Sequence, residues 1–102
     1  MRPIRRIVCC CSSGIGSSLM VEMNLQRALA NLQIQGVTTG HTSLSEIGEY
    51  DADLFVTGKD LAEQMRRYPR VIVLTRLISL KELTEKLRTA FAQESDTFFI
   101  TD

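Results

Sequence analysis

The chain has 102 residues, a length that corresponds to one domain. Its content of Leu, Ile, Val and Phe lies well above the roughly 20% below which disorder is expected, so we predict a single globular domain over residues 1–102. The 12 basic and 12 acidic side chains give a net charge of zero. This argues against nucleic-acid binding and against a polybasic membrane surface, because both require clustered positive charge.

The N-terminal residues, MRPIRRIVCCC, place basic side chains before an apolar stretch, as a secretory signal peptide does. The apolar part, from Ile7 to Cys11, is shorter than the roughly 7–15 residues such a peptide needs, and no small-residue cleavage site follows it. No apolar run elsewhere approaches the roughly 20 residues of a membrane-spanning helix. These features predict a cytoplasmic protein.

Three cysteines occupy adjacent positions, Cys9, Cys10 and Cys11. An odd number of neighbouring cysteines is a poor framework for disulfides. Neighbouring residues of a strand point to opposite faces, so these thiols are not expected to bind one metal ion together. The sequence contains no second cluster of Cys and His residues, and we expect neither a metal nor a cofactor.

The first half of the chain predicts a strand, a loop and a helix. The segment Ile4–Cys10 is typical of a parallel strand that is buried on both faces, because its apolar residues follow one another without alternation. A glycine-bearing loop follows at residues 11–17. A helix is expected from about Ser18, with Gly36 as its C-terminal stop. The apolar residues at helical spacing are Val21, Leu25, Ala28 and Leu32.

The second half alternates strand-like and helix-like segments. Further strands are expected at residues 37–43, 54–56 and 71–74. Helical segments are expected at residues 44–49, 61–67 and 80–91. Two pairs of residues have the spacing of a capping box, Ser43 with Glu46 and Ser79 with Glu82. The tail, residues 97–102, is expected to be a short extra strand or disordered.

This order of elements predicts an α/β fold. We expect a three-layer sandwich in which a four-stranded parallel sheet of order 2-1-3-4 carries helices on both faces. Ligands of such sheets bind beyond the carboxyl ends of the strands, near the point where the strand order reverses. The functional site is therefore expected in the loop that follows the first strand.

The loop after the first strand combines a thiol, glycines and hydroxyl groups. Gly14 and Gly16 allow backbone conformations in which successive N–H groups turn inward and bind an anion. The N-terminus of the following helix adds free N–H groups and the positive end of its dipole. This field favours the thiolate of Cys11, which makes that residue the expected nucleophile. The expected phosphate-binding residues are Ser12, Ser13, Gly14, Ile15, Gly16, Ser17 and Ser18.

Other phosphate-binding loops need residues that this loop lacks. A nucleotide-binding P-loop requires Gly-Lys-Ser/Thr, whereas Ser17 follows Gly16 here. A small tyrosine phosphatase carries an Arg six positions after its nucleophile, and counting from Cys11 that position is Ser17. No Arg or Lys occurs between Arg6 and Arg27, so the loop has no strong clamp for a phosphoryl transition state. A dinucleotide fingerprint needs a third glycine.

The same residues also have purely structural interpretations. Cys11 could be a buried thiol, because free cysteines are among the most buried residues. The loop could be a tight turn in which Ser17 or Ser18 caps the helix, a role that is compatible with phosphate binding. Cys9 and Cys10 are interpreted as small core side chains of the first strand.

Outside the loop, structural roles are favoured. His41 is the only histidine, and we leave it out of the site although its pKa range suits proton transfer. Met20 and Met23 are expected in the core, with a partner-docking surface as the alternative. An ordinary solvated basic face is expected to hold Arg66, Arg67 and Arg70.

The motif Cys-x-x-Gly-x-Gly-Ser-Ser, which starts at Cys11, resembles the enzyme IIB components of the bacterial sugar phosphotransferase system, in particular their ascorbate and galactitol branch. The similarity extends over nearly all of residues 4–91. It includes Ser17-Ser18-Leu19-Met20, Ser43-Leu44-Ser45-Glu46, Ala52-Asp53-Leu54 and Val56-Thr57. Ser12 and Ser13 stand where this branch often has Gly and Asn, a difference that bears on the substrate more than on the chemistry.

The resemblance implies a phosphoryl relay. Phosphohistidine of an enzyme IIA partner donates its phosphoryl group to Cys11, residues 12–18 cradle it, and the phosphocysteine passes it to a sugar or ascorbate held by the membrane permease, enzyme IIC. Such a relay implies a cytoplasmic protein at the permease and an exposed, shallow site. The residues alone leave two alternatives, a small cysteine phosphatase or arsenate-reductase-like enzyme and a non-catalytic regulatory module that binds an anion.

Overall fold

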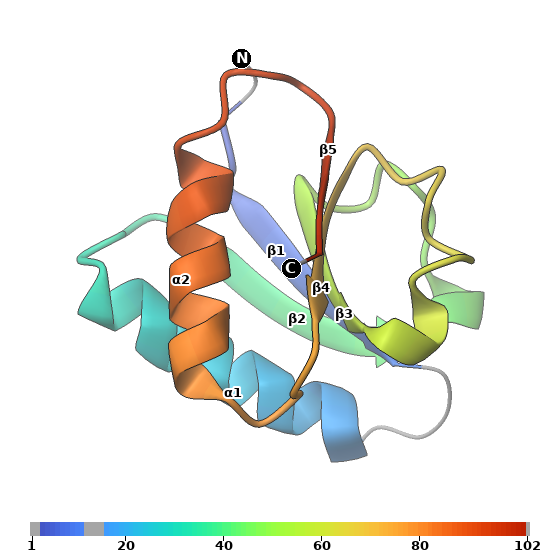
Figure 1. Cartoon of the computed structure of the whole chain (residues 1–102), viewed down its shortest axis with the longest axis horizontal. Coiled ribbons are helices and arrows are strands. Elements are labelled where there is room, and N and C mark those ends of the chain that lie inside the picture. Colours follow the sequence, from blue (N-terminus) through green and yellow to red (C-terminus); the bar gives the residue numbers. More distant parts are fainter. Residues whose placement is uncertain (1–2, 12–15, 102) are drawn as a thin grey trace.

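The computed structural model describes residues 3–11 and 16–101, and over these residues the chain forms an α/β fold around one parallel sheet (Figure 1). The strands are β1 (Arg6–Cys11), β2 (Thr38–Ser43), β3 (Leu54–Gly58), β4 (Arg70–Leu74) and β5 (Phe98–Ile100). The α-helices are α1 (Gly16–Asn31) and α2 (Leu80–Phe91), and the 3₁₀ helices are η1 (Leu44–Glu46) and η2 (Lys59–Leu61). None of these helices combines the length and the apolar character that crossing a membrane requires.

The strand order is β2-β1-β3-β4-β5, so the predicted order of the first four strands is confirmed and the tail adds a fifth strand. Of the two expectations for the tail, the short strand is the one that the structure contains. β5 pairs with β4 in parallel, with Phe99 beside Val71. Phe98 and Ile100 pack on one side of the sheet and Phe99 on the other, which is the alternation that a strand produces.

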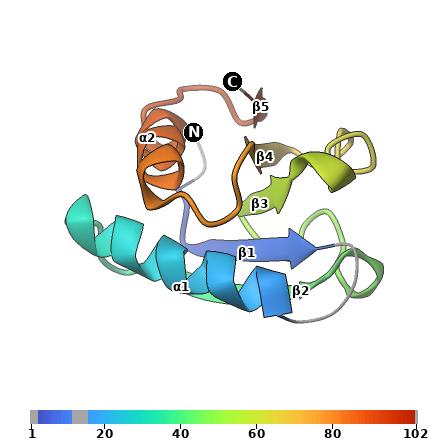
Figure 2. The same cartoon turned by 60° about the horizontal axis from the view of Figure 1, so that its bottom comes forward.

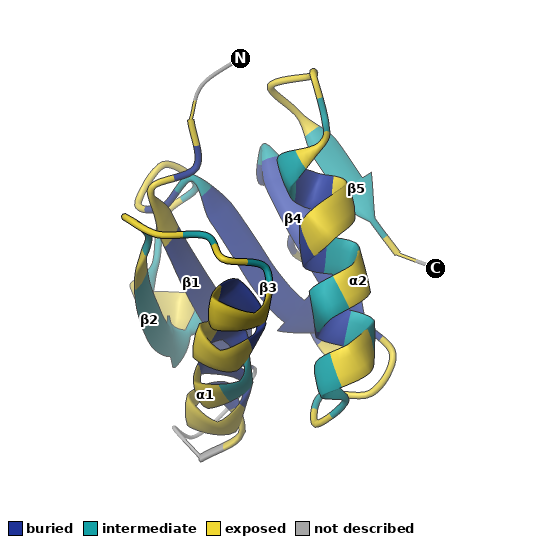
Figure 3. Ribbon diagram, turned by 90° about the vertical axis from the view of Figure 1, so that its left-hand side faces the viewer, coloured by how far each residue is buried: buried dark blue, intermediate teal, exposed yellow. Residues whose placement is uncertain are grey.

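The sheet has a covering layer on each face. α1 and α2 lie side by side on one face, where they bury residues such as Ile7, Leu54 and Ile72 (Figures 2 and 3). The opposite face buries Phe55 and Val71 beneath η1, η2 and the turns that follow η2. The three layers agree with the prediction, but the second covering layer consists of 3₁₀ helices and turns instead of α-helix.

The connection between β3 and β4 differs from the helix expected at residues 61–67. After η2 its turns are held mainly by bonds over three residues, such as the 3.0 Å bond from the Tyr68 nitrogen to the Met65 oxygen. The connection has to return the chain along the sheet before Pro69, and 3₁₀ turns advance about 2.0 Å per residue against about 1.5 Å for an α-helix. Met65 and Tyr68 are buried against the sheet.

The C-terminus of α1 is closed at Gln33, so the expected stop at Gly36 is wrong. Gln33 has a φ of 58°, in the left-handed region. The nitrogens of Gln33 and Ile34 donate to the carbonyls of Ala30 and Leu29 over 3.0 and 2.9 Å. This pair of bonds is a Schellman motif, which usually has glycine where Gln33 stands.

The buried stripe of α1 agrees with the helical periodicity only in part. Val21, Leu25 and Ala28 are buried, as predicted. Met20 and Met23 are exposed, so their expected place in the core is wrong. The reason is geometric, because α1 presents one face to the sheet and α2, and residues 20 and 23 lie on its other side.

Of the two expected capping boxes, only the serine half of the second forms, because the Ser79 nitrogen donates to the Arg76 oxygen and not to the Glu82 carboxylate. At the start of α2, Ser79 Oγ accepts a hydrogen bond from the Glu82 nitrogen at 3.1 Å. At η1, Ser43 caps no backbone N–H, and its Oγ lies 3.1 Å from Ser45 Oγ instead. A three-residue 3₁₀ helix is too short to present the N–H groups of an α-helical N-terminus.

The basic patch expected from three arginines is divided. Arg66 and Arg67 are exposed, whereas Arg70 is 0% exposed. Arg70 begins β4 beside Phe98 of β5, and its Nε donates to the Asp96 backbone oxygen at 3.3 Å. The expectation that Arg70 lies on a solvated face is therefore wrong, because the added strand and the residues before it cover this side chain.

Candidate functional site

The site expected after the first strand lies where the strand order of the sheet reverses. From β1 the chain runs to β2 on one side, and β3 pairs with β1 on the other side. Cys11 is the last residue of β1 and lies beside Ser43 of β2. Thr57 Oγ1 donates to the Cys10 oxygen at 3.2 Å, which ties the carboxyl end of β1 to that of β3.

A small cavity of about 30 Å³ lies at this edge of the sheet, with room for about one water molecule. It is lined by Cys10, Cys11, Ser17, Ser18, Val21, Gly58, Asp60 and Leu77. The structure thus brings together the expected nucleophile, Cys11, and two of the expected phosphate-binding residues, Ser17 and Ser18. Gly16 is the first residue of α1. Residues 12–15, namely Ser12, Ser13, Gly14 and Ile15, lie outside the described residues.

The helix dipole is directed favourably for an anion at this cavity. α1 has 16 residues and no acidic side chain in its first turn. Its N-terminal turn contributes Ser17, which is exposed, and Ser18, which is buried. Free N–H groups and the positive dipole end at such a terminus stabilise phosphate-sized anions.

Cys11 is less accessible than expected, because the resemblance implied an exposed, shallow site. Cys11 is 8% exposed, which counts as buried, and it lines a cavity of about 30 Å³ in place of an open, shallow surface. Burial of this degree is also what the structural-thiol interpretation expects. The two interpretations differ in the surroundings, because the described lining holds two serines from a helix N-terminus.

The other two cysteines behave as core residues, as predicted. Cys9 packs with the α-helical side of the sheet and Cys10 with the opposite side. Burial raises the pKa of the Cys10 thiol to about 12 and, with the nearby Glu22 carboxylate, raises the pKa of the Cys9 thiol still further. Both thiols therefore stay protonated near neutral pH and are poor nucleophiles.

Sequence reasoning missed the contribution of the end of β3 to the cavity. Gly58 ends β3 and Asp60 follows in η2. A Cβ atom at Gly58 would lie 3.0 Å from Asp60 Oδ1 and 3.0 Å from Leu77 Cδ2, so the glycine lets these side chains close over it. One signal for this contribution was available. The strand that becomes β3 was expected beside β1, and the carboxyl ends of neighbouring parallel strands lie at the same edge of the sheet.

His41 lies outside the cavity and joins α1 to β2. Its Nδ1 is 2.5 Å from Glu22 Oε1, and Thr39 Oγ1 donates to Glu22 Oε2 at 2.6 Å. Burial opposes ionisation of Glu22, but the hydrogen bonds from Thr39 and His41 outweigh it and lower the pKa of this carboxyl group. These contacts support the choice to leave His41 out of the site.

Among residues 3–11 and 16–101, no group of three or more His, Cys, Asp or Glu side chains is arranged to hold a metal ion. The chemistry available at the described part of the cavity is that of two thiols, two hydroxyl groups, the Asp60 carboxylate and a helix N-terminus. An α/β domain with this arrangement at the end of its first strand has a helix N-terminus, which suits an anionic group, beside a thiol.

The comparison with protein families agrees with this arrangement. Residues 6–89 match the family model described as "PTS system, Lactose/Cellobiose specific IIB subunit", where PTS denotes the sugar phosphotransferase system. The chain belongs to this family. It is therefore a IIB component of the phosphotransferase system, and such components act with IIA and IIC components in sugar uptake.

A curated relative comes from the same system. The chain is 28% identical over 105 residues to the "PTS system mannitol-specific EIICBA component" of Klebsiella pneumoniae, and the match covers 97% of this chain. It covers 16% of the relative's length. The names of the family model and the relative specify different sugars, so the ascorbate and galactitol branch suggested by the loop stays a prediction.

Proposed function

We propose that this chain carries a phosphoryl group on Cys11. The group arrives from a phosphohistidine of the IIA component and leaves to a sugar or ascorbate held by the membrane component IIC. The chain acts on the cytoplasmic side, where it associates peripherally with the permease. The loop similarity favours a substrate of the ascorbate and galactitol type.

The first transfer exchanges one phosphorus bond for another. The Cys11 sulfur attacks the phosphorus, a P–S bond forms, and the P–N bond to the histidine breaks. The thiol proton ends on the imidazole nitrogen that held the phosphoryl group, so atoms and charge balance. In the second transfer a hydroxyl oxygen of the substrate attacks the phosphorus, a P–O bond forms and the P–S bond breaks. The departing Cys11 sulfur takes up the proton of that hydroxyl.

The observation that carries the proposal is the shared cavity of Cys11 and the first turn of α1, formed with Ser17 and Ser18. Hydroxyl groups and backbone N–H groups stabilise a phosphoryl group without the bidentate grip of an arginine. A relay needs this weaker grip, because the group must leave again. Family membership supports the same role.

The experiment that tests the proposal is an intact-mass measurement after incubation with phosphorylated IIA. We expect the wild-type chain to gain one phosphoryl group and Cys11→Ala to gain none. Cys10→Ala is the matched control, because Cys10 lines the same cavity, and it should still be phosphorylated. A gain of mass that survives Cys11→Ala, or no gain in the wild-type chain, contradicts the proposal.

A further inference from the structure

Asp60 places a carboxylate in the lining of the Cys11 cavity. It belongs to η2, the 3₁₀ helix that follows β3. The residue is exposed, but its Oδ1 atom lies only 3.0 Å from the position of a Cβ atom added at Gly58. The side chain therefore turns back over the end of β3 and brings its negative charge beside the cavity.

The register of the sheet puts this carboxylate on the same face as the Cys11 side chain. β1 and β3 are parallel neighbours, with Cys9 beside Val56. Two residues further along the strands, Cys11 is the neighbour of Gly58. Neighbouring strands lie about 4.8 Å apart, and side chains at paired positions point to the same face. Because Asp60 Oδ1 lies over the Cβ position of Gly58, it is close to the Cys11 side chain.

No basic side chain pairs with this carboxylate in the described structure. Within residues 3–11 and 16–101, none of the ion pairs includes Asp60. The adjacent Lys59 is exposed and does not belong to the described lining of the cavity. Residues 12–15 add no charge, because they are Ser, Ser, Gly and Ile. The site thus combines a helix N-terminus, which attracts an anion, with a carboxylate, which repels it.

Phosphorylation of Cys11 brings a second negative group beside Asp60. A phosphoryl group carries a charge of about −1.5 to −2 at neutral pH, whereas a protonated thiol is neutral. Two unit charges about 4 Å apart in water change an equilibrium constant roughly fivefold. Repulsion of this size raises the free energy of the phosphorylated form and does not affect the form with a neutral thiol.

We propose that the Asp60 carboxylate limits how tightly the phosphoryl group is held on Cys11, so that the group leaves readily to the substrate. The bonds that form and break are those of the two transfers above, and Asp60 takes up no proton in either. This inference rests on the proposed function, because it assigns a further residue to the same site. The structural alternative is that Asp60 only stabilises the first turn of η2.

The test measures the equilibrium of the first transfer. The chain is mixed with the phosphorylated IIA protein of the source organism that phosphorylates it fastest, and intact-mass spectra give the phosphorylated fraction of both proteins. Asp60→Asn keeps the size of the side chain and removes its charge. We expect this variant to shift the equilibrium toward phosphocysteine roughly fivefold in about 0.01 M salt. The shift should fall below about twofold in about 1 M salt, because salt screens exposed charges.

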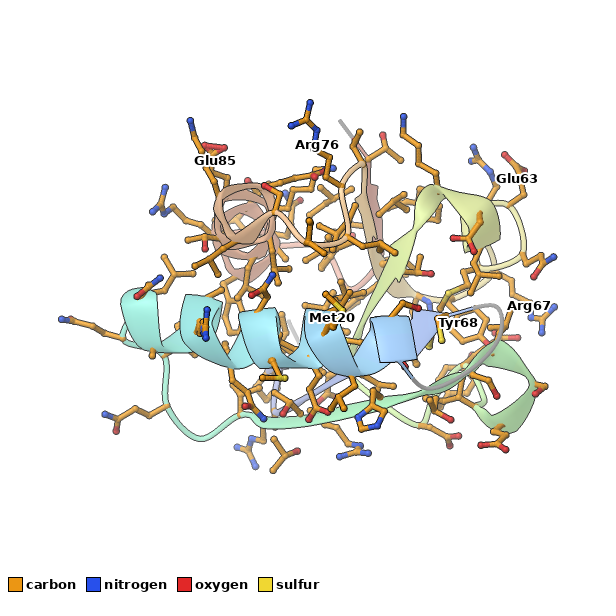
Figure 4. The ribbon with its side chains drawn as sticks, turned by 90° about the horizontal axis from the view of Figure 1, so that it is seen from below. Met20, Glu63, Arg67, Tyr68, Arg76 and Glu85 are labelled. Atoms are coloured by element: carbon orange, nitrogen blue, oxygen red, sulfur yellow. The ribbon has the colours of Figure 1, made fainter. Side chains whose placement is uncertain are left out.

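Two matched variants separate the charge from the shape of the side chain. Asp60→Glu restores the carboxylate and should keep the equilibrium within about twofold of the wild-type value. Glu63→Gln should do the same, because it removes an exposed carboxylate of the same connection that lies outside the described lining of the cavity (Figure 4). Thermal unfolding checks the fold, and these exposed positions should leave the Tm within a few degrees.

Onward transfer gives an independent measurement. Membrane vesicles that contain the IIC component and its substrate receive the phosphorylated chain, and the phosphorylated substrate is measured over time. We expect Asp60→Asn to pass on its phosphoryl group more slowly than the wild-type chain, although IIA phosphorylates it at least as fast. The two transfers therefore respond in opposite directions, which a purely structural role of Asp60 does not produce.

Four results would overturn the inference. An unchanged equilibrium in Asp60→Asn, or a shift away from phosphocysteine, shows that the carboxylate does not oppose the bound group. An equal shift in Asp60→Glu shows that the charge is not the cause. Slowing of both transfers in Asp60→Asn shows a structural role. A wild-type chain that accepts no phosphoryl group from any IIA protein refutes the proposed function and this inference with it, whereas the other results refute the inference alone.

Discussion

Glu82 Oε1 accepts a hydrogen bond of 2.8 Å from the Arg76 backbone nitrogen, so a helix side chain holds the loop that leads into its own N-terminus. The other oxygen of Glu82 receives the Thr75 nitrogen at 2.6 Å and Lys86 Nζ at 2.7 Å. Burial opposes ionisation of this carboxyl group, but the hydrogen bonds from Lys86, Thr75 and Arg76 outweigh it and lower its pKa to about 2.

The lowered pKa of Glu82 predicts a stability loss in acid. The folded pKa of about 2 lies below the ordinary value of 4.5, so the contribution is fully present above pH 4.5 and disappears as the pH falls through about 2. Its size is on the order of 2–3 kcal/mol. Urea unfolding should show Glu82→Gln less stable than the wild-type chain at pH 7, with the difference shrinking toward pH 2.

Glu85→Gln is the control for this measurement, because Glu85 lies on the same helix but is exposed (Figure 4). It should leave the pH dependence close to that of the wild-type chain. A difference between wild type and Glu82→Gln that stays constant from pH 7 to pH 2 would contradict the assignment.

The parts of the fold that the sequence predicted share a strong local signal. Leu54, Val56 and Ile72 belong to short apolar runs between turn residues, and such runs suit strands that are covered on both faces. The start of α2 was predictable because the Ser79 cap is a contact between residues close in sequence. The place of the candidate cavity could be expected from position, since Cys11 ends β1, an inner strand at the point where the strand order reverses.

The parts that could not be predicted depend on contacts between distant residues. Arg70 looks like a surface residue in sequence, and only the added strand β5 and Asp96 show that it is buried. Met20 and Met23 fit an apolar helix pattern, and only the position of α1 shows that they face outward. Asp60 reaches the cavity through η2, whose turns have no apolar periodicity to reveal them.

The left-handed residue at the end of α1 predicts a stabilising substitution. Gln33 has a φ of 58°, where a side chain costs about 1 kcal/mol relative to glycine. Gln33→Gly should raise the free energy of unfolding by about 0.5–1 kcal/mol, measured by urea unfolding. Gly36 has a φ of 80° with nothing within 4 Å of an added Cβ, so Gly36→Ala should lower stability by about 1 kcal/mol through backbone strain alone. Equal effects of the two substitutions would contradict this account.

The close packing at Gly58 predicts a selective loss of phosphorylation. A Cβ at this position would lie 3.0 Å from Asp60 Oδ1 and from Leu77 Cδ2. Both atoms end flexible side chains, so the fold should persist at a cost of about 1–2 kcal/mol, while the cavity around Cys11 changes shape. Gly58→Ala should slow phosphorylation of Cys11 at least tenfold.

Gly48→Ala is the matched control for Gly58→Ala. Its added Cβ would meet Asp51 Oδ2 at 3.5 Å, an ordinary contact, and neither residue belongs to the described lining of the Cys11 cavity. The phosphorylation rate of this variant should equal that of the wild-type chain. A Gly58→Ala chain that is phosphorylated at the full rate would show that the cavity shape is unimportant for the transfer.

The composition of the site predicts that the chain does not hydrolyse phosphate esters. Hydrolysis through a phosphocysteine needs a charged group that stabilises the phosphoryl transition state, commonly an arginine. The described lining of the cavity contains neither Arg nor Lys, and none occurs in the sequence between Arg6 and Arg27. With p-nitrophenyl phosphate we expect a rate no higher than that of Cys11→Ala. Turnover that disappears in Cys11→Ala would favour a cysteine phosphatase over a carrier, because it would show that water, not a substrate held by a partner, receives the phosphoryl group.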